Sequence, residues 1–332
     1  MLRIAVLGVG HLGSIHARLW TQQTRACLAG VYDTDAERAA AKAQELGVPA
    51  FTDLPSILDV CDAVTIAVPT IHHEAVALQC LAAGKHCLIE KPIAHSVGAA
   101  ENILREAAQR GLRLQVGHVE RFNPALRAAR TFPLGPHFIE AHRLSQFRPR
   151  ATDVSVIHDL MIHDIDIVLS MVRSPVARVT ANGVCVLTDT VDLVHARIDF
   201  ENGTVANLSA SRISASPMRK MRIFQKGMYL SIDFAKPGLD VFRVFDTETD
   251  VVPASGNLIP ASMLGDIAAA PEKRTIMFEQ PAVEARNAIS DEQTAFVDAL
   301  LDGTPVAVSG EDALEALRIA SVIERQILEA GR

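Results

Sequence analysis

The fold of the first third of this chain is decided by one stretch near its start, Leu2-Arg3-Ile4-Ala5-Val6-Leu7-Gly8-Val9-Gly10-His11-Leu12-Gly13. The apolar run at its beginning has the length and composition of a buried β-strand. Three glycines with the spacing G-x-G-x-x-G follow at once, and a helical pattern over Ser14–Trp20 comes next. A strand, a glycine-rich turn and a helix in this order open a βαβ unit.

The three glycines have separate tasks in a phosphate-binding turn. Gly8 permits the tight turn, Gly10 lets the backbone approach a diphosphate, and Gly13 allows the helix to pack closely on the strand. The diphosphate then lies on the backbone N–H groups at the helix N-terminus, which belong here to residues from His11 and Leu12 onward. A lone motif of this kind is weak evidence, but the strand before it and the helix after it are the context that the mechanism needs. The stretch therefore predicts a dinucleotide-binding Rossmann domain.

Asp33 ends the second predicted strand, twenty residues after Gly13. A carboxylate at this place accepts hydrogen bonds from both ribose hydroxyls of NAD and repels the 2′-phosphate of NADP. Arg38 is the only nearby cation in the sequence. We therefore expect NAD as the cofactor in preference to NADP. The alternative is a structural glycine turn followed by a surface aspartate.

The remaining sequence shows two different patterns. Short apolar runs alternate with helical segments in the first part, which is typical of an α/β fold with a doubly wound parallel sheet. Later runs such as Val194–Phe200 alternate apolar with polar residues, and Asn202-Gly203 indicates a hairpin. We expect an NAD-binding Rossmann domain at 1–119 and an α+β domain with a mostly antiparallel sheet at 120–332. Residues 250–288 show little periodicity and predict a long loop.

Composition excludes several classes of function. A net charge of −7 without any Lys/Arg-rich run argues against a nucleic-acid partner. The five cysteines contain no C-x-x-C pair, which is typical of reduced thiols in a cytosolic protein. No apolar stretch approaches the roughly 18 residues of a membrane helix. We expect a soluble, cytoplasmic protein with a small-molecule partner and no membrane partner.

A basic residue follows another predicted strand, in Glu90-Lys91-Pro92. Ligands of open α/β sheets bind outside the carboxyl ends of the strands, so Lys91 is expected to point toward the cofactor. A partly desolvated lysine there can exchange a proton with a substrate hydroxyl. The alternative is an ordinary solvated lysine at a strand end.

A predicted helix over Val156–Val172 is dense in titratable groups. Asp159 and His163 stand four residues apart and share a helix face, and Asp166 continues the same stripe. A carboxylate beside an imidazole fixes its tautomer and raises its basicity, as an acid–base histidine requires. The alternatives are an incidental surface pair and a metal site. Because H-x-x-x-H and C-x-x-C spacings are missing, no metal is predicted.

Taken together, these segments resemble the Gfo/Idh/MocA oxidoreductase family over essentially the whole chain. The similarity rests on the glycine motif, Glu90-Lys91-Pro92, Gly117–Pro124 and the stretch Asp159–Asp166. The resemblance implies a catalytic group of Lys91, Asp159 and His163, with further cofactor contacts from Pro69, His73, Glu90 and Lys91. It also implies that the second sheet forms the substrate floor and often an oligomer interface, so a homo-oligomer (dimer or tetramer) is expected. Met161 departs from the pattern, since the family usually has glycine there.

Within the family, Gly117–Pro124 and the segment from Arg150 to Asp153 are similar to the enzymes that oxidise C3 of UDP-N-acetylglucosamine. The similarity implies NAD-dependent oxidation of a secondary hydroxyl on a sugar, a UDP-N-acetylhexosamine. Arg148 and Arg150 suit the diphosphate of such a substrate, because guanidinium groups match phosphate oxygens. Three further residues are expected to line the cleft: Glu120, Arg121 and Asn123. Their alternatives are a solvated loop for the arginines, and capping or ion pairs for the other three. Two rival functions remain, a free sugar or inositol dehydrogenase and a catalytically silent NAD-binding regulator.

Overall fold

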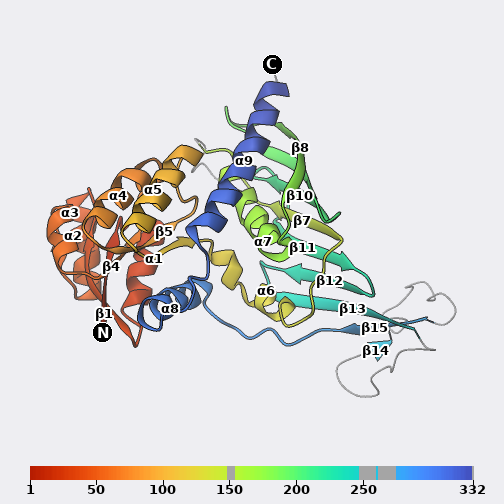
Figure 1. Ribbon diagram of the computed structural model, residues 1–332, viewed down its shortest axis with the longest axis horizontal. Coiled ribbons are helices and arrows are strands. Elements are labelled where there is room, and N and C mark those ends of the chain that lie inside the picture. The colour runs from red at the N-terminus through yellow and green to blue at the C-terminus, as the bar shows by residue number, and fades with distance from the viewer. Residues whose placement is uncertain (148–153, 247–258, 261–273, 331–332) are drawn as a thin grey trace. The chain divides into compact units, whose positions relative to one another are not determined.

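A computed structural model describes most of the chain, namely residues 1–147, 154–246, 259–260 and 274–330. Their contacts group into two compact units, Met1–Phe122 with Asn287–Arg318, and Asn123–Arg286 with Ile319–Arg332. Each unit has a β-sheet of its own (Figure 1). The division differs from the predicted domains 1–119 and 120–332, because residues 287–318 pack in the first unit although they follow the second in sequence.

The first unit is built on a sheet of six parallel strands among the residues described (Figure 1). The strands are β1 (Leu2–Leu7), β2 (Ala26–Tyr32), β3 (Ala50–Phe51), β4 (Ala63–Ile66), β5 (His86–Glu90) and β6 (Leu114–Gly117). Their order is β3-β2-β1-β4-β5-β6, with every neighbouring pair parallel. The strand order reverses between β1 and β4, which is where doubly wound sheets bind ligands. The predicted Rossmann sheet is confirmed, and only the two-residue β3 was not foreseen.

Helices connect these strands, and three of the helices begin at residues with capping side chains. They are α1 (His11–Trp20), α2 (Ala36–Leu46), α3 (Leu54–Asp59), α4 (His73–Ala82), α5 (Val97–Gln109) and the short 3₁₀ turns η1 (Thr70–His72) and η2 (Val119–Phe122). Asp35, Asp53 and Ser96 each accept a backbone N–H of the first turn that follows, in α2, α3 and α5 respectively. Gly47 ends α2 with φ of +67°, a left-handed conformation that favours glycine.

Helix α8 (Ala288–Leu301) belongs to the first unit although it lies 170 residues beyond β6 (117 to 287). Phe296 and Val297 are buried in the same apolar cluster as Ile4 and Trp20. Arg25 at the start of the sheet binds Asp298 and Asp302 at 2.7 and 2.6 Å in the last turn of α8 and just after it. Apolar burial of this kind is worth roughly 1.5–3 kcal/mol per large side chain, so it holds α8 on the Rossmann sheet.

The second unit is built on a mixed sheet of nine strands among the residues described (Figure 1). These are β7 (Phe138–Leu144), β8 (Val176–Val184), β9 (Leu193–Phe200), β10 (Val205–Ser211), β11 (Met218–Gln225), β12 (Met228–Asp233), β13 (Gly238–Asp246), β14 (Ile259–Pro260) and β15 (Arg274–Glu279). Only β10 and β7 pair in parallel; the other neighbours are antiparallel. The predicted mostly antiparallel sheet is therefore confirmed.

Glycine turns set the register of this sheet, and one of its strands lies in a segment that was predicted to be a loop. Gly203 has φ of +85° in the predicted turn between β9 and β10, and Gly227 has φ of +73° between β11 and β12. Residues 250–288 were expected to be a loop, but Arg274–Glu279 forms β15 along β13. The pairing is long-range, so the sequence around β15 shows no hairpin signal for it.

Helical segments pack on this sheet and carry the titratable stretch of the sequence. They are α6 (Pro124–Ala129), a π-helical turn η3 (Ile157–Met161), α7 (Ile162–Val172) and the end of α9 (Gly310–Ala330). The N–H of Ile162 bonds to the carbonyl of Ile157, five residues back. One extra residue in that turn makes it wider than the α-helix predicted for 156–172, and π turns of this kind are frequent at functional sites.

Two buried side chains hold the residues just before η3. Asp192 is fully buried, and its Oδ2 accepts the N–H groups of Val186, Leu187 and Thr188 at 2.7, 2.6 and 3.0 Å. Burial opposes its ionisation, but these N–H groups outweigh burial and lower the pKa of Asp192 to about 2. Arg212, 3.8 Å from Asp192, donates to the carbonyl oxygen of Val154. The carboxylate therefore fixes the backbone from which η3 starts.

A buried ion pair fixes α7 on the sheet. Arg143 of β7 and Asp164 of α7 are about 3% exposed each and meet in a two-pronged contact of 2.9 and 2.7 Å. The guanidinium also lies 5.8 Å from the centre of the Phe234 ring. Because Asp164 follows His163 directly, this pair sets the orientation of the helix that carries the histidine.

Removing one partner of this pair is expected to destabilise the second unit strongly. Asp164→Ala leaves the Arg143 charge buried and uncompensated, which costs about 3–5 kcal/mol. The double variant Arg143→Met/Asp164→Leu, which removes both charges, is expected to lose much less. Urea unfolding of the three proteins measures the difference. Equal losses for the single and double variants would show that packing, and not the charge pair, holds α7.

Candidate active site

The glycine turn after β1 has the geometry of a phosphate cradle. A Cβ atom on Gly13 would lie 1.8 Å from the carbonyl oxygen of Gly8, so α1 approaches the strand end more closely than any side chain allows. Gly8 has φ of +82° and lies against the backbone of Ala67. A Cβ on Gly10 would meet nothing within 4 Å. The space over Gly10 is open, as the approach of a diphosphate requires, and the first N–H groups of α1 have no partner within a helix.

Asp33 lies beside this turn at the end of β2. Its side chain is only 8% exposed, and its Oδ2 accepts the N–H of Val9 at 2.8 Å while Oδ1 accepts the N–H of Asp35 at 2.9 Å. Arg38 stands 3.3 Å from Oδ1 and is itself half-exposed. The carboxylate thus ties the second strand to the glycine turn. The residues present fit an NAD molecule with its diphosphate on α1 and its ribose at Asp33.

Glu90 and Lys91 lie at the carboxyl end of β5. Oε1 of Glu90 is 2.8 Å from Nε2 of His16 in α1, and Oε2 accepts the backbone N–H of Lys91 at 3.2 Å. Burial opposes ionisation of Glu90, but the contact with His16 and the Lys91 charge outweigh burial and lower its pKa. Glu90 was predicted among the cofactor ligands; in the structure its oxygens contact the His16 ring and the backbone N–H of Lys91.

His73 and Pro69 occupy the loop after β4. The His73 ring is 1% exposed, with Nδ1 2.9 Å from the carbonyl of Pro92 and Nε2 2.9 Å from the carbonyl of Val68. Burial lowers the pKa of His73, so the ring stays neutral and donates to one of these carbonyls. The ring therefore braces the turn that follows Lys91. Pro69 is exposed beside it.

The predicted substrate residues differ in their surroundings. Arg121 of η2 is 9% exposed and pairs with Asp312 at 3.0 Å. Asn123 caps α6, accepting the N–H of Ala125 at 3.1 Å and donating to the carbonyl of Phe234 at 3.2 Å. These contacts are of the kind expected if Arg121 serves in an ion pair and Asn123 as a helix cap. Glu120 is half-buried in η2. Arg148 and Arg150 lie outside the described residues.

Asp159 and His163 are half-buried on η3 and at the start of α7, whereas Asp164 and Asp166 are almost fully buried. Burial thus separates the stretch into two pairs. His158 of the same turn binds Glu324 of α9 at 3.1 Å, and this hydrogen bond lowers the pKa of Glu324. Met161, the departure noted in the sequence, is fully buried and fills space below the turn.

Sequence reasoning missed the residues that α8 and β7 bring to these sites. Gln293 of α8 donates to the carbonyl of His16 at 3.1 Å, and Glu292 lies fully buried beside it. Arg143 was not singled out either, although it holds Asp164. Gln293 and Arg143 each pair across more than twenty positions, and no local spacing could have indicated these contacts.

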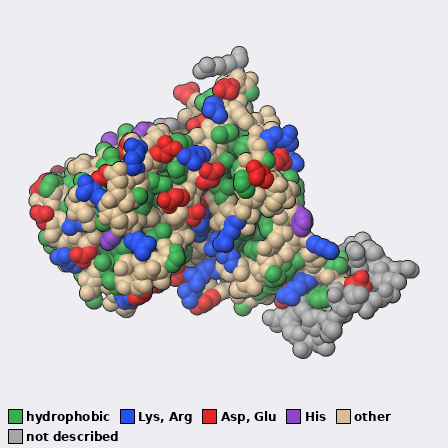
Figure 2. Space-filling view, viewed as in Figure 1, with side chains coloured by type: hydrophobic (Ala, Val, Ile, Leu, Met, Phe, Trp, Pro, Cys, Tyr) green, Lys and Arg blue, Asp and Glu red, His purple; other side chains and the backbone are tan. Residues whose placement is uncertain are grey.

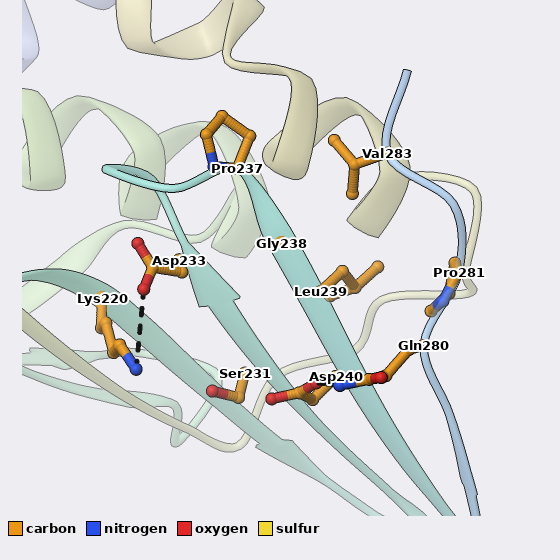
Figure 3. Close-up of a pocket in the computed structure, with 10 residues that line it drawn as sticks. All are labelled: Lys220, Ser231, Asp233, Pro237, Gly238, Leu239, Asp240, Gln280, Pro281 and Val283. Atoms are coloured by element: carbon orange, nitrogen blue, oxygen red, sulfur yellow. Dashed lines mark hydrogen bonds and ion pairs between the residues drawn. The ribbon is translucent and has the colours of Figure 1, made fainter. Parts of the chain in front are cut away.

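A shallow hollow of about 290 Å³ opens on the second unit at the ends of β11, β12 and β13 (Figure 3). Its polar lining groups bind one another: Lys220 is 3.6 Å from Asp233, and Gln280 donates to Asp240 at 2.8 Å. None of the predicted site residues lines it. The hollow is therefore a feature apart from the candidate site.

The described residues show neither a strongly charged surface of one sign in Figure 2 nor a cluster of metal-ligating side chains. On the face shown in Figure 2, acidic and basic side chains are interspersed, as expected from 32 basic and 39 acidic residues. Among the described residues, no group of three or more His, Cys, Asp or Glu side chains is placed to hold a metal ion. Nor is any helix in the described part long and apolar enough to cross a membrane.

Comparison with known proteins matches both parts of the chain to models of one oxidoreductase family. Residues 2–118 match the model of an oxidoreductase family with an NAD-binding Rossmann fold, and residues 124–229 match the GFO/IDH/MocA C-terminal domain. UDP-N-acetylglucosamine 3-dehydrogenase of Acidithiobacillus ferrooxidans is 43% identical over 243 residues, 73% of this chain and 77% of that protein. The scyllo-inositol 2-dehydrogenase (NAD(+)) of Bacillus subtilis is 30% identical over 233 residues, 64% of this chain and 68% of that one.

A solved structure extends the likeness to nearly the full length. The UDP-N-acetylglucosamine 3-dehydrogenase GnnA from Acidithiobacillus ferrooxidans superposes with a TM-score of 0.86 at 35% identity, covering 98% of this chain and 97% of the other. Since the two domain models follow one another along the chain as they do in a single family, this NAD-binding oxidoreductase belongs to the Gfo/Idh/MocA family.

Proposed function

We propose that this protein oxidises a secondary hydroxyl group of a nucleotide sugar, a UDP-N-acetylhexosamine, at C3 with NAD as the oxidant. The observation that carries the proposal is the 43% identity to a UDP-N-acetylglucosamine 3-dehydrogenase, together with the full-length likeness to a solved structure of that enzyme. Inositol dehydrogenases are similar over a smaller share of this chain and at lower identity. Arg148 and Arg150, for which no structure is described, remain the proposed contacts of the diphosphate.

The reaction divides into a hydride and a proton. Bound NAD would accept the hydride from the carbinol carbon, leaving a carbonyl group, while the hydroxyl proton passes to a side chain of the protein. Glu90, directly before Lys91 in the sequence, has a lowered pKa because the contact with His16 and the Lys91 charge outweigh its burial, so it is an ionised carboxylate. We therefore assign Lys91 the binding of the substrate oxygen, whose developing negative charge an ammonium group stabilises.

His163 is then the proton acceptor. Its ring stands one residue before the buried Asp164, so the Arg143–Asp164 pair fixes its position on α7. Asp159, on the wider turn η3, is assigned the orientation of this ring. In this scheme Lys91 binds the substrate oxygen and His163 takes its proton.

Loss of either side chain should reduce turnover without removing the cofactor. His163→Ala and Lys91→Ala are each expected to lower kcat by about 10²–10⁴-fold on UDP-N-acetylglucosamine, the usual contribution of a positioned acid or base. NAD affinity should stay within a few-fold, because neither side chain is assigned to the phosphates or adenosine. Steady-state NADH formation and calorimetric NAD binding measure the two quantities separately.

The same assay decides between the rival functions. Free hexoses and inositols serve as comparison substrates, and Asp159→Asn serves as the milder variant because it keeps the shape of the side chain. Faster turnover of an inositol than of any UDP-sugar would replace the nucleotide-sugar proposal. An NAD complex that forms without turnover of any of these substrates would favour the silent regulator.

We also propose that NAD is preferred to NADP, because the Asp33 carboxylate repels a 2′-phosphate. Asp33→Asn is the sharp test, since the amide oxygen still accepts the N–H of Val9 while the charge is gone. The parent is expected to bind NAD at least tenfold more tightly than NADP, about 1.4 kcal/mol, and the variant should narrow that ratio. Fluorescence titration with both cofactors measures it. Equal affinities in the parent would contradict the assignment.

The open face of the second sheet supports a homo-oligomer. Five aromatic side chains from neighbouring strands form a row on it, with ring centres 4.7–5.9 Å apart: Phe138, Phe224, Tyr229, Phe242 and Phe278. Arg222 and Glu140 pair at 3.1 Å in the next row. An apolar row flanked by paired charges is suited to meet the same row of a second copy.

A charge in the aromatic row is expected to separate the subunits. Phe224→Asp should convert an oligomeric parent to a smaller species in sedimentation or light-scattering measurements, because a carboxylate cannot be buried there unpaired. Leu187→Asp is the matched control, since Leu187 is 60% exposed in the β8–β9 turn, away from the row. A monomeric parent at micromolar concentration would rule out this interface.

A further inference from the structure

One acidic side chain of the first unit has no place in the scheme above. Glu292 of α8 is 0% exposed, and neither of its carboxyl oxygens has a hydrogen-bond partner among the described residues. An ionised carboxylate without partners in a dry interior is strongly unfavourable, so such a group either binds a proton or is paired. Glu292 therefore needs an account.

The acidic group whose charge acts on Glu292 is Glu90. Burial raises the pKa of Glu292 well above its ordinary value near 4.5, and the charge of Glu90 raises it further. The other titratable groups on the elements around α8 are His11, His16 and Arg18 of α1, Lys91 after β5, Asp291 and Asp298 of α8 itself, and His118, Glu120 and Arg121 in or before η2. Arg121 is paired with Asp312. The group that acts on Glu292 most directly is thus a second carboxylate.

Two carboxyl groups in one dry site do not both ionise, and the hydrogen bonds show which one keeps the proton. Glu90 has His16 at 2.8 Å and the N–H of Lys91 at 3.2 Å, and both favour its charged form. Glu292 has no such donor. The negative charge therefore belongs to Glu90 and the proton to Glu292.

The backbone of α8 holds this acid in place. Gln115 of β6 donates to the carbonyl of Glu292 at 3.1 Å and accepts the N–H of Ala307 at 3.3 Å. Gln293 donates to the carbonyl of His16 at 3.1 Å, and its own Oε1 is a buried acceptor without a partner among the residues described.

We propose that Glu292 is a positioning residue for Lys91, kept as an uncharged acid behind the Glu90–His16 pair so that a single negative charge faces the lysine. The inference rests on the catalytic role proposed for Lys91. Loss of that proton would place two negative charges behind the lysine and disturb the contact that orients it.

The protonation of Glu292 can be tested without any activity. Infrared difference spectra between the parent and Glu292→Gln should show the carbonyl band of a carboxylic acid in the parent at pH 7. In the same pair, the folding equilibrium of the parent should fall by about tenfold per pH unit above pH 4.5 relative to the variant, because unfolding releases one proton. An absent acid band, or parallel pH–stability curves, would overturn the proposal.

Kinetics test the link to Lys91. Glu292→Gln keeps the shape and a hydrogen-bond donor, so kcat should stay within about twofold. Glu292→Met fills similar space and cannot ionise, so it should remove the loss of kcat that ionisation of Glu292 gives the parent at high pH, with NAD affinity unchanged. A folded Glu292→Met with parent kcat and parent pH profile would show that Glu292 only fills space. If Lys91→Ala itself keeps full turnover, the proposed function fails, while the infrared and stability results still stand.

Discussion

His16 and Glu90, 2.8 Å apart, join three parts of the first unit that are far apart in sequence. His16 stands on α1, whose N-terminus forms the phosphate cradle, and Glu90 ends the strand from which Lys91 projects. Gln293 of α8 contacts the same histidine from the other side at 3.3 Å. The cradle, the lysine and α8 therefore share one buried contact. A substitution in any of the three parts is expected to alter the contacts of the other two, because they are packed around the same His16–Glu90 pair.

The parts of the fold that the sequence predicted are those with local causes. The glycine spacing predicted the turn after β1, because φ of +82° at Gly8 and the close approach at Gly13 exclude side chains. The Asn202-Gly203 turn was predicted for the same reason. The stretch Thr34-Asp35-Ala36-Glu37 has the pattern of a capping box that begins at Thr34, but Asp35 is the cap of α2, a shift of one residue. The local sequence therefore predicts that a helix is present more firmly than it predicts the residue at which the helix begins.

The parts that were missed depend on distant partners. Helix α8 lies within the predicted second domain 120–332 but packs in the first unit, because Phe296 and Val297 are buried against residues such as Trp20 that are far away in the sequence. The π turn at Ile157–Met161 leaves no distinct pattern in the sequence. The contacts that hold the segment around it come from Arg212 and Glu324, which are far away in the chain. For the candidate site, the motif residues were found from the sequence, whereas their supports Glu292, Gln293 and Arg143 were not.

Adjacent acidic residues of the same motif have different physical tasks. Asp164 and Asp166 are almost fully buried, and Asp164 holds α7 to the sheet through Arg143, whereas Asp159 and His163 are half-buried. A buried ion pair contributes little net stability, since desolvation offsets its attraction, but it excludes other orientations of the helix because any of them leaves a charge unpaired. In the first unit, Glu90 pairs with His16 and accepts the backbone N–H of Lys91. The two residues proposed for catalysis, Lys91 and His163, thus each stand next in sequence to a carboxylate that is held by a partner far away in the chain.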